Sequence, residues 1–260
     1  VVMNKTPISR ATIDACPYIR LIAVLATGYN VVDYQHAREK GIPVVNVPTY
    51  GTASVSQFSI ALLLEICHHI GHHSASVHNG DWAANPDWCY WDYPLIELAG
   101  KTIGIIGFGR IGQHLGVMAK AIGMNVIAFD IFHIPGIEEQ LGIPYVEMDE
   151  LLAKSDFVSV HAPAVDGGAL ISAENIAKMK DGVVVINTSR GTNVDEAALL
   201  AALESGKVRA AGLDVYADEP ATNKALYSHP MVSCTPHIGA ATVEAQKRIG
   251  VEIVDIIKAM

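Results

Sequence analysis

The sequence contains few charged and few aromatic residues. Charged side chains make up 17% of the 260 residues and aromatic ones 7%, whereas 50% are hydrophobic. This composition excludes a disordered chain, because disorder requires more charge and fewer apolar side chains. Basic residues are also scarce: 18 Lys and Arg stand against 27 Asp and Glu, which leaves a formal charge of -9. We therefore expect neither a nucleic acid nor an anionic membrane as a partner.

Paired cysteines and long apolar runs are absent as well. The cysteines lie far apart and form no CxxC pair (Cys16, Cys67, Cys89 and Cys234), which indicates reduced thiols in a cytoplasmic protein. The longest apolar candidate, Ile60–Ile70, is interrupted by Glu65 and is shorter than the roughly 18 residues that span a bilayer. We expect no membrane segment and no signal peptide. The start at Val1 rather than at methionine suggests a part of a longer protein.

Short runs rich in Val and Ile alternate with amphipathic stretches. The runs predict strands that are buried on both faces, over Leu21–Ala26, Pro43–Val47, Thr102–Ile106, Asn125–Phe129, Phe157–Val160, Val183–Asn187, Ala211–Val215 and Met231–Thr235. The amphipathic stretches predict helices over Ala53–Ile70, Ile111–Ile122, Ala173–Met179 and Asp195–Leu203. For the last helix, Asn193 and Glu196 predict the N-cap and Gly206 the C-terminal end. This alternation predicts an α/β fold with a doubly wound parallel sheet.

The two ends of the chain contain too few elements to fold alone. Residues 1–50 hold only two predicted strands, and 241–260 has the pattern of one helix, whereas an independent sheet usually needs three or more strands. We predict that 1–50 and 241–260 form a second, smaller domain, which is incomplete at its N-terminus. Residues 51–240 then form the larger domain.

A glycine-rich turn, GxGxxG, directly follows the predicted strand that ends at Ile106. Gly107 would permit a tight turn, Gly109 would let a pyrophosphate approach the backbone, and Gly112 would let helix and strand pack closely. Asp130 ends the next predicted strand, where a carboxylate can bind ribose hydroxyls and repel a 2′-phosphate. The pattern predicts a dinucleotide site that favours NAD over NADP, and a purely structural turn is the alternative.

Three ionisable residues follow later predicted strands: Arg190, Glu219 and His237. Ligands of doubly wound sheets bind at these strand ends. Together the three side chains could supply a fixed cation for a carboxylate, a carboxylate that orients a histidine, and a general acid/base. Taken singly, an arginine in a surface salt bridge and a structural histidine are the alternatives.

At these motifs the chain resembles the D-isomer-specific 2-hydroxyacid dehydrogenases. The matching segments are GFGRIG (107–112), HAP (161–163), INTSRG (186–191), GLDVYADEP (212–220) and TPHIG (235–239). Within this family the chain is most similar to the glycerate dehydrogenase (hydroxypyruvate reductase) branch, in VLATGYNVVD (24–33), NVPTYGTASVSQ (46–57) and CYWDYPLIELAGKTIGIIGFGRIG (89–112).

The resemblance implies a Rossmann cofactor domain with a smaller, flavodoxin-like substrate domain. It implies an NAD-dependent enzyme that interconverts a small 2-oxo acid, like hydroxypyruvate or glyoxylate, and its D-2-hydroxy acid by hydride transfer. The alternative of a different class is a non-catalytic NAD-sensing scaffold, like the corepressors that share the fold. Relative to the family, the N-terminal part is shorter and the loop at 164–168 is a residue shorter.

The resemblance also assigns roles to single residues. Arg190, Glu219 and His237 match the catalytic residues, and Arg190 and His237 would bind substrate together with Thr27, Gly28 and Trp91. The cofactor residues would be Gly107, Gly109, Arg110, Ile111, Gly112, Asp130, His161, Pro163, Thr188, Ser189, Asp214 and Gly239.

Histidines and aromatic residues cluster between 53 and 93. The pairs His68/His72 and His69/His73 are spaced four apart, as in helical zinc sites, but no HExxH glutamate accompanies them, so we predict no metal. The nearby rings Trp82, Trp88, Tyr90 and Trp91 are typical of core or interface anchors. We predict a two-fold homodimer built around 53–93, in which the resemblance sends Trp91 to the substrate site of the neighbouring subunit.

Overall fold

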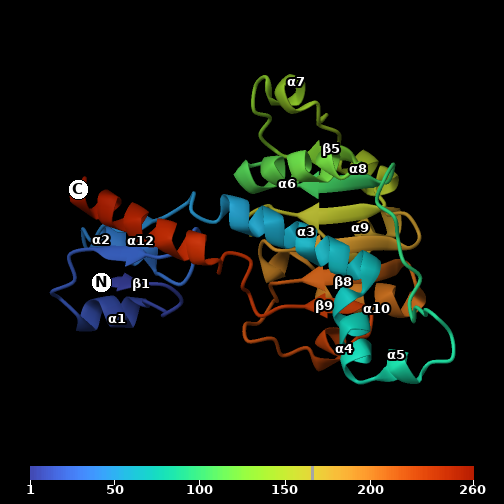
Figure 1. Cartoon of the computed structure of the whole chain (residues 1–260). Helices are drawn as coiled ribbons and strands as arrows, with labels where there is room; N and C mark the ends of the chain where they lie inside the picture. The colour runs from blue at the N-terminus through green and yellow to red at the C-terminus, as the bar shows by residue number, and fades with distance from the viewer. Residues whose placement is uncertain (165–166) are drawn as a thin grey trace. The chain divides into compact units, whose positions relative to one another are not determined.

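The chain divides into two compact units (Figure 1). The computed structural model describes residues 1–164 and 167–260. One unit consists of Val1–Ser54 with Gly239–Met260, and the other of Val55–Ile238. The boundaries predicted from the sequence, at residues 50 and 240, differ from these by a few residues.

The first unit is built on a small parallel sheet of order β1-β2-β3. Its strands are β1 (Val2–Met3), β2 (Ile22–Val24) and β3 (Val44–Asn46), and its helices are α1 (Arg10–Ala15), α2 (Tyr34–Glu39) and α12 (Val243–Lys258). Along β2, Ile22 and Val24 pack on one face in a cluster with α1 and α2, whereas Ala23 packs on the other with α12. Side chains alternate between the faces of a strand, so the sheet is covered on both sides. The sequence prediction missed β1.

The second unit is built on a six-stranded sheet of order β5-β4-β6-β7-β8-β9, and every neighbouring pair is parallel. The strands are β4 (Thr102–Ile106), β5 (Asn125–Phe129), β6 (Phe157–Val160), β7 (Val183–Asn187), β8 (Val208–Leu213) and β9 (Val232–Cys234). All residues of β6 and β7 are buried, because helices cover both faces, as a parallel sheet requires. The predicted doubly wound sheet is confirmed.

Helices lie on both faces of this sheet (Figure 1). On one face, α3 (Thr52–His68) and α6 (Arg110–Ala121) contribute to one apolar core, and on the other face α8 (Met148–Lys154), α9 (Ala173–Lys178) and α10 (Glu196–Ser205) contribute to a second. The remaining short elements are α4 (Ile70–His78), α5 (Asp81–Ala84), α7 (Ile137–Leu141), α11 (Lys224–Tyr227) and the 3-10 turn η1 (Gly191–Asn193).

The strands β2, β3, β8 and β9 differ from their predicted bounds by one to three residues at each end. Two further local predictions were wrong. The helix predicted over Ala53–Ile70 ends at His68, because His69 adopts a left-handed conformation (φ 47°) and α4 starts in a new direction. The N-cap of α10 is Asp195 rather than Asn193: the Asp195 carboxylate accepts hydrogen bonds from the first-turn amides. The predicted end of α10 at Gly206 (φ 79°) is confirmed.

Within the described residues, no single helix is both long and apolar enough to cross a membrane. The pair α3 and α4 has the required length and composition when joined, but the two helices meet at an angle of 62°. The apolar side chains of α3, such as Leu63 and Ile66, are buried in the core of the second unit, which accounts for their hydrophobicity.

Candidate functional site

The register of the large sheet brings the predicted site residues to one edge. The last residues of the six strands pair with one another across the sheet. The residues that follow these strand ends therefore stand side by side at the carboxyl edge: Gly107, Asp130, His161, Thr188, Asp214 and Thr235. The sequence had singled out all of these except Thr235.

The glycine loop after β4 fits a dinucleotide. Gly107 has φ 93°, and a Cβ there would overlap the backbone of Ala162, whereas a Cβ at Gly112 would overlap the carbonyl oxygen of Gly107. Gly109, the N-cap of α6, is not crowded as Gly107 and Gly112 are: a Cβ there would meet no neighbouring atom within 4 Å. No side chain hydrogen-bonds to the first amides of α6. The open space lies in front of uncapped helix amides, which is the environment that binds a pyrophosphate.

Asp130 is held by the backbone on both sides of it. Its carboxylate accepts hydrogen bonds from the amide of Phe108, at 2.6 Å, and from the amide of Phe132, at 3.0 Å. A carboxylate has about four acceptor sites, so ribose hydroxyls can still bind. The sequence did not indicate that Asp130 also shapes the glycine loop.

His161, which follows β6, is a neutral histidine. Its Nε2 lies 2.8 Å from the hydroxyl of the buried Ser159, and its buried Nδ1 has no partner among the described residues. Burial lowers the pKa of His161 from 6.5 to about 4, because a charged ring would lose its hydration. The next residues, Ala162 and Pro163, lead into the loop at 164–168, of which 165 and 166 lie outside the described residues.

The loop after β7 carries Thr188, Ser189 and Arg190. The guanidinium of Arg190 donates to the carbonyl oxygen of Ser189 at 2.6 Å. The hydroxyl of Thr188 lies 2.8 Å from that of the buried Ser59 on α3. Since Ser59 donates its own proton to Val55, Thr188 is the donor in this pair. Ser59 was missed by the sequence reasoning, because only the packing of α3 on the sheet brings it to this loop.

Glu219 and His237 form a close pair, as the sequence predicted from their roles. His237 Nδ1 lies 2.6 Å from Glu219 Oε2, and both side chains are about one-third exposed, at 37% and 34%. A carboxylate only accepts hydrogen bonds, so Nδ1 carries the proton and Nε2 is left to exchange protons with a ligand. The other carboxylate oxygen accepts from the amide of Tyr216 at 3.3 Å.

Hydrogen bonds to Asp214 fix the backbone around His237. His237 has a left-handed conformation, with φ 56°. Asp214, 1% exposed, accepts hydrogen bonds from the Thr235 hydroxyl at 2.7 Å and from the Ile238 amide at 2.9 Å.

The loops that carry Arg190 and Glu219 are also in close contact. Gly191 lies so near the backbone of Tyr216 that a Cβ at position 191 would overlap it.

Three further predicted residues belong to the first unit. The side-chain amide of Asn46 donates to the carbonyl oxygen of Thr27 at 2.6 Å. Thr27 and the adjacent Gly28 thus lie in a loop beyond the end of β2. Gly239 accepts a hydrogen bond from the hydroxyl of Ser54 at 2.7 Å. Thr27 and Gly239 are therefore anchored by contacts within their own unit.

The histidines between 69 and 73 contact Asp92 and Tyr93, in the segment that follows α5. His72 Nε2 lies 2.6 Å from the carboxylate of Asp92, His73 Nε2 accepts from the Asp92 amide, and His69 stacks on Tyr93. Within the described residues, no three His, Cys, Asp or Glu side chains are grouped as metal ligands would be. The bend at His69 also places His68 on α3 but His72 and His73 on α4.

The tryptophans between 82 and 91 are largely exposed. Trp88 and Trp91 expose 91% and 64% of their surface, and Trp82, at 48%, donates to the carbonyl oxygen of Trp88. They are therefore not core residues of the unit that contains them.

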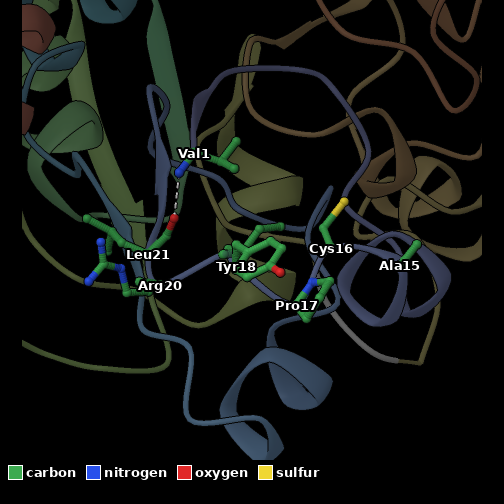
Figure 2. Close-up of a pocket in the computed structure, with 8 residues that line it drawn as sticks. Val1, Ala15, Cys16, Pro17, Tyr18, Arg20 and Leu21 are labelled. Carbon is green, nitrogen blue, oxygen red and sulfur yellow. Dashed lines mark hydrogen bonds between the residues drawn. The ribbon is translucent and has the colours of Figure 1, made fainter.

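Two cavities in the described part of the chain lie away from the predicted site residues. An open cavity of about 640 Å³ lies in the first unit and is lined by Val1 and 15–21 (Figure 2), and one of about 460 Å³ is lined by Leu64, His68, Ile122 and 95–99. No predicted site residue lines either of them. The first cavity has Tyr18 and Cys16 at its surface and lacks an acid/base pair of the kind formed by Glu219 and His237.

The sequence matches a known protein family, and relatives align with nearly the whole of this chain. The family model for the NAD binding domain of the D-isomer specific 2-hydroxyacid dehydrogenases matches residues 60–239. A hydroxypyruvate reductase from Blautia hydrogenotrophica is 55% identical over 251 residues, which cover 96% of this chain and 78% of that protein.

Solved structures agree with these matches. The pyruvate reductase of Chlamydomonas reinhardtii superposes with a TM-score of 0.87 at 34% identity, over 98% of this chain and 80% of that one. A D-lactate dehydrogenase from Aquifex aeolicus, solved with NAD and lactic acid, gives 0.86 at 30% identity, over 99% and 81%. These similar proteins are named as enzymes, so the alternative of a non-catalytic scaffold receives no support.

Proposed function

Because the chain belongs to the D-isomer specific 2-hydroxyacid dehydrogenases and is an NAD-dependent oxidoreductase, we propose that its substrate is a 2-oxo acid of the size of hydroxypyruvate or glyoxylate. The product of reduction is then the D-2-hydroxy acid. The observation that carries the proposal is the pair of His237 and Glu219, at 2.6 Å, on a sheet edge that also bears Arg190. The name of the 55% identical relative, hydroxypyruvate reductase, supports the same substrate class.

His237 acts as the general acid in reduction and as the general base in oxidation. Its Nδ1 is occupied by Glu219, so Nε2 gives the proton to the 2-oxo oxygen or takes it from the hydroxyl. Glu219 fixes this tautomer. Reduction uses a proton on Nε2, and oxidation uses the lone pair of the same nitrogen as the proton acceptor.

Arg190 binds the substrate carboxylate and polarises the 2-oxo group. A guanidinium presents several donors in one plane, so it can contact both acceptors together. One Nη of Arg190 is bonded to the carbonyl oxygen of Ser189, which restrains the side chain and leaves the other donors for substrate. We assign the first unit to the substrate, and within it Thr27 and Gly28 to binding a substrate carboxylate through their backbone amides.

NAD would be held by the strand ends of the second unit. Gly107, Gly109, Arg110, Ile111 and Gly112 receive the pyrophosphate at the start of α6, and Asp130 binds the adenosine ribose. Further contacts in this unit come from His161, Pro163, Thr188, Ser189 and Asp214. Gly239, which belongs to the first unit, is also a predicted cofactor residue. When bound, the nicotinamide supplies or accepts the hydride.

A second copy of the chain completes the assembly in this proposal. The exposed rings of Trp88 and Trp91 favour an interface, because large aromatic side chains anchor subunit contacts. We place a two-fold homodimer around 53–93, with Trp91 reaching the substrate site of the partner. A monomeric mass by light scattering at micromolar concentration would contradict the dimer, and full activity of Trp91→Ala would contradict the role of that side chain.

We also propose a cytoplasmic location. All four cysteines, which lie within the described residues, are free thiols, and free thiols suit a reducing compartment. Fractionation of cells that produce the protein tests the location, and recovery outside the cytoplasm would contradict it.

The substrate is tested by the rate of NADH oxidation with hydroxypyruvate, glyoxylate and pyruvate. We expect kcat/KM to be highest for one of the first two, and turnover of none of the three would refute the proposed function.

The cofactor site is tested by Asp130→Ala, which we expect to weaken NADH binding by about 1–3 kcal/mol, the loss of hydrogen bonds to a charged group. Unchanged NADH affinity by calorimetry would refute the assignment of Asp130.

A further inference from the structure

Asn187, the last residue of β7, uses its whole side chain to hold the loop that presents Arg190. It is 0% exposed. Its amide nitrogen donates to the carbonyl oxygen of Arg190 at 2.8 Å, and its amide oxygen accepts from the backbone amide and the hydroxyl of Ser189, at 3.1 and 2.8 Å. Three hydrogen bonds from one buried side chain thus fix the backbone of Ser189 and of Arg190 itself.

A second buried amide closes the same loop from the other side. The backbone amide of Asn193 donates to the carbonyl oxygen of Arg190 at 3.1 Å. Its side-chain nitrogen lies 3.1 Å from the hydroxyl of Ser189 and donates to the carbonyl oxygen of Ala162 at 2.9 Å. The loop of Arg190 is therefore held by a closed set of hydrogen bonds, which also joins it to the loop after β6.

The chemistry of this position favours asparagine. Aspartate is not equivalent here, because a carboxylate in place of the Asn187 amide would set an acceptor against the Arg190 carbonyl oxygen, which needs a donor. An alanine would leave the Ser189 amide without its side-chain partner, and unmet buried groups are costly. Arg190 itself has an extended backbone, with φ -138° and ψ 137°, so the loop is held by these bonds rather than by an unusual conformation.

We propose that Asn187 is a positioning residue for substrate binding, which acts by holding the backbone of Ser189 and Arg190. The inference rests on the proposed role of Arg190 in binding the substrate carboxylate. Misplacement of a substrate-binding group by about 1 Å can lower activity about 100-fold, so a buried amide that never touches substrate can still determine its affinity.

The test measures binding of oxalate, a dianion that resembles the carboxylate and 2-oxo group of the substrate, to the full-length protein with NADH. We expect Asn187→Ala and Asn187→Asp to weaken oxalate binding about tenfold, the scale of one lost hydrogen bond with its displaced partner. Asn125→Ala is the control, because the Asn125 side chain also donates to a backbone carbonyl oxygen, that of Gly100 at 2.8 Å, but at the start of β5 and thus at the opposite end of the strands from Arg190. It should leave oxalate affinity unchanged.

A double-mutant cycle separates positioning from a general loss of structure. In an Arg190→Ala background, Asn187→Ala should change oxalate affinity by less than about twofold, because the group that it positions is gone. An equal loss in both backgrounds would overturn the positioning role. Wild-type oxalate affinity in Arg190→Ala would instead overturn the role of Arg190 in the proposed function. Alanine avoids a buried charge, so the cycle stays interpretable if Asn187→Asp does not fold.

Discussion

The loops of Arg190 and His237 present their side chains from the same sheet edge but are held in different ways. Arg190 has extended backbone and lies in a loop closed by the buried amides of Asn187 and Asn193. His237 has a left-handed backbone, with φ 56°, and its ring is bonded to the ionisable Glu219.

The difference matches what each group has to do. A guanidinium keeps its charge at every physiological pH, so neutral hydrogen bonds to its backbone are sufficient to place it. An imidazole that exchanges a proton needs a partner that stabilises its charged form, and a carboxylate supplies this. The same molecule contains the opposite case: His161 has a serine hydroxyl as partner, and burial keeps it neutral.

The largest effect should come from His237→Ala, which removes the proton donor. We expect kcat for reduction to fall by about 10²–10⁴, the usual contribution of a general acid/base, while NADH binding is retained. Steady-state kinetics and NADH titration measure the two effects. Glu204→Ala, on the exposed side of α10 and outside the proposed dimer segment, is the control and should keep wild-type activity. Reduction at the wild-type rate by His237→Ala would show that the histidine loop is not catalytic.

The tight packing of the arginine loop is tested by Gly191→Ala. A Cβ at Gly191 would overlap the backbone of Tyr216, which cannot turn away as a flexible side chain can. We expect the free energy of unfolding to fall by about 3 kcal/mol, the upper end of the usual cost of overpacking, measured by chemical denaturation. Gly250→Ala on α12 is the matched control, because no atom lies within 4 Å of its virtual Cβ. Equal stability of the two variants would mean that the loops are less closely packed than described.

The neutral state of His161 predicts a pH-dependent stability. Burial lowers its pKa from 6.5 to about 4, so below pH 6.5 the unfolded chain takes up a proton that the folded chain does not bind. The free energy of unfolding should therefore fall, by up to about 3 kcal/mol, as pH decreases from about 6.5 to about 4. This part of the slope should disappear in His161→Gln. Identical pH dependence of the melting temperature in both proteins would contradict a buried neutral histidine.

The smallest effect concerns the backbone of the histidine loop. A left-handed conformation costs a non-glycine residue roughly 1–2 kcal/mol. We therefore expect His237→Gly to be more stable than His237→Ala by about 1 kcal/mol, although both lack the catalytic ring. Denaturation curves of the two variants provide the measurement. The same pair of changes at Arg190 should show no gain for glycine, because the backbone there is extended.

Local sequence was sufficient for the sheet and for the glycine turn. The Val- and Ile-rich runs predicted β4, β5, β6 and β7 with their observed bounds, because strands buried on both faces need apolar side chains at every position. The turn at 107–112 was recognisable because each glycine meets a separate local requirement. Once the strands are parallel, their ends must meet at one edge, so the candidate residues there could be named before any contact was known.

Tertiary structure decided what depends on partners distant in sequence. The strand β1, of two residues, is too short to show a period and exists because β2 offers it a parallel neighbour. The helix break at His69 and the contact of Ser59 with Thr188 follow from packing between elements. In the sequence, Asn187 can be recognised only as a polar residue at the end of an apolar strand. In the folded loop, its side-chain amide makes three hydrogen bonds. Sequence patterns record burial and local conformation, whereas the direction of a buried polar side chain is set by the backbone that surrounds it.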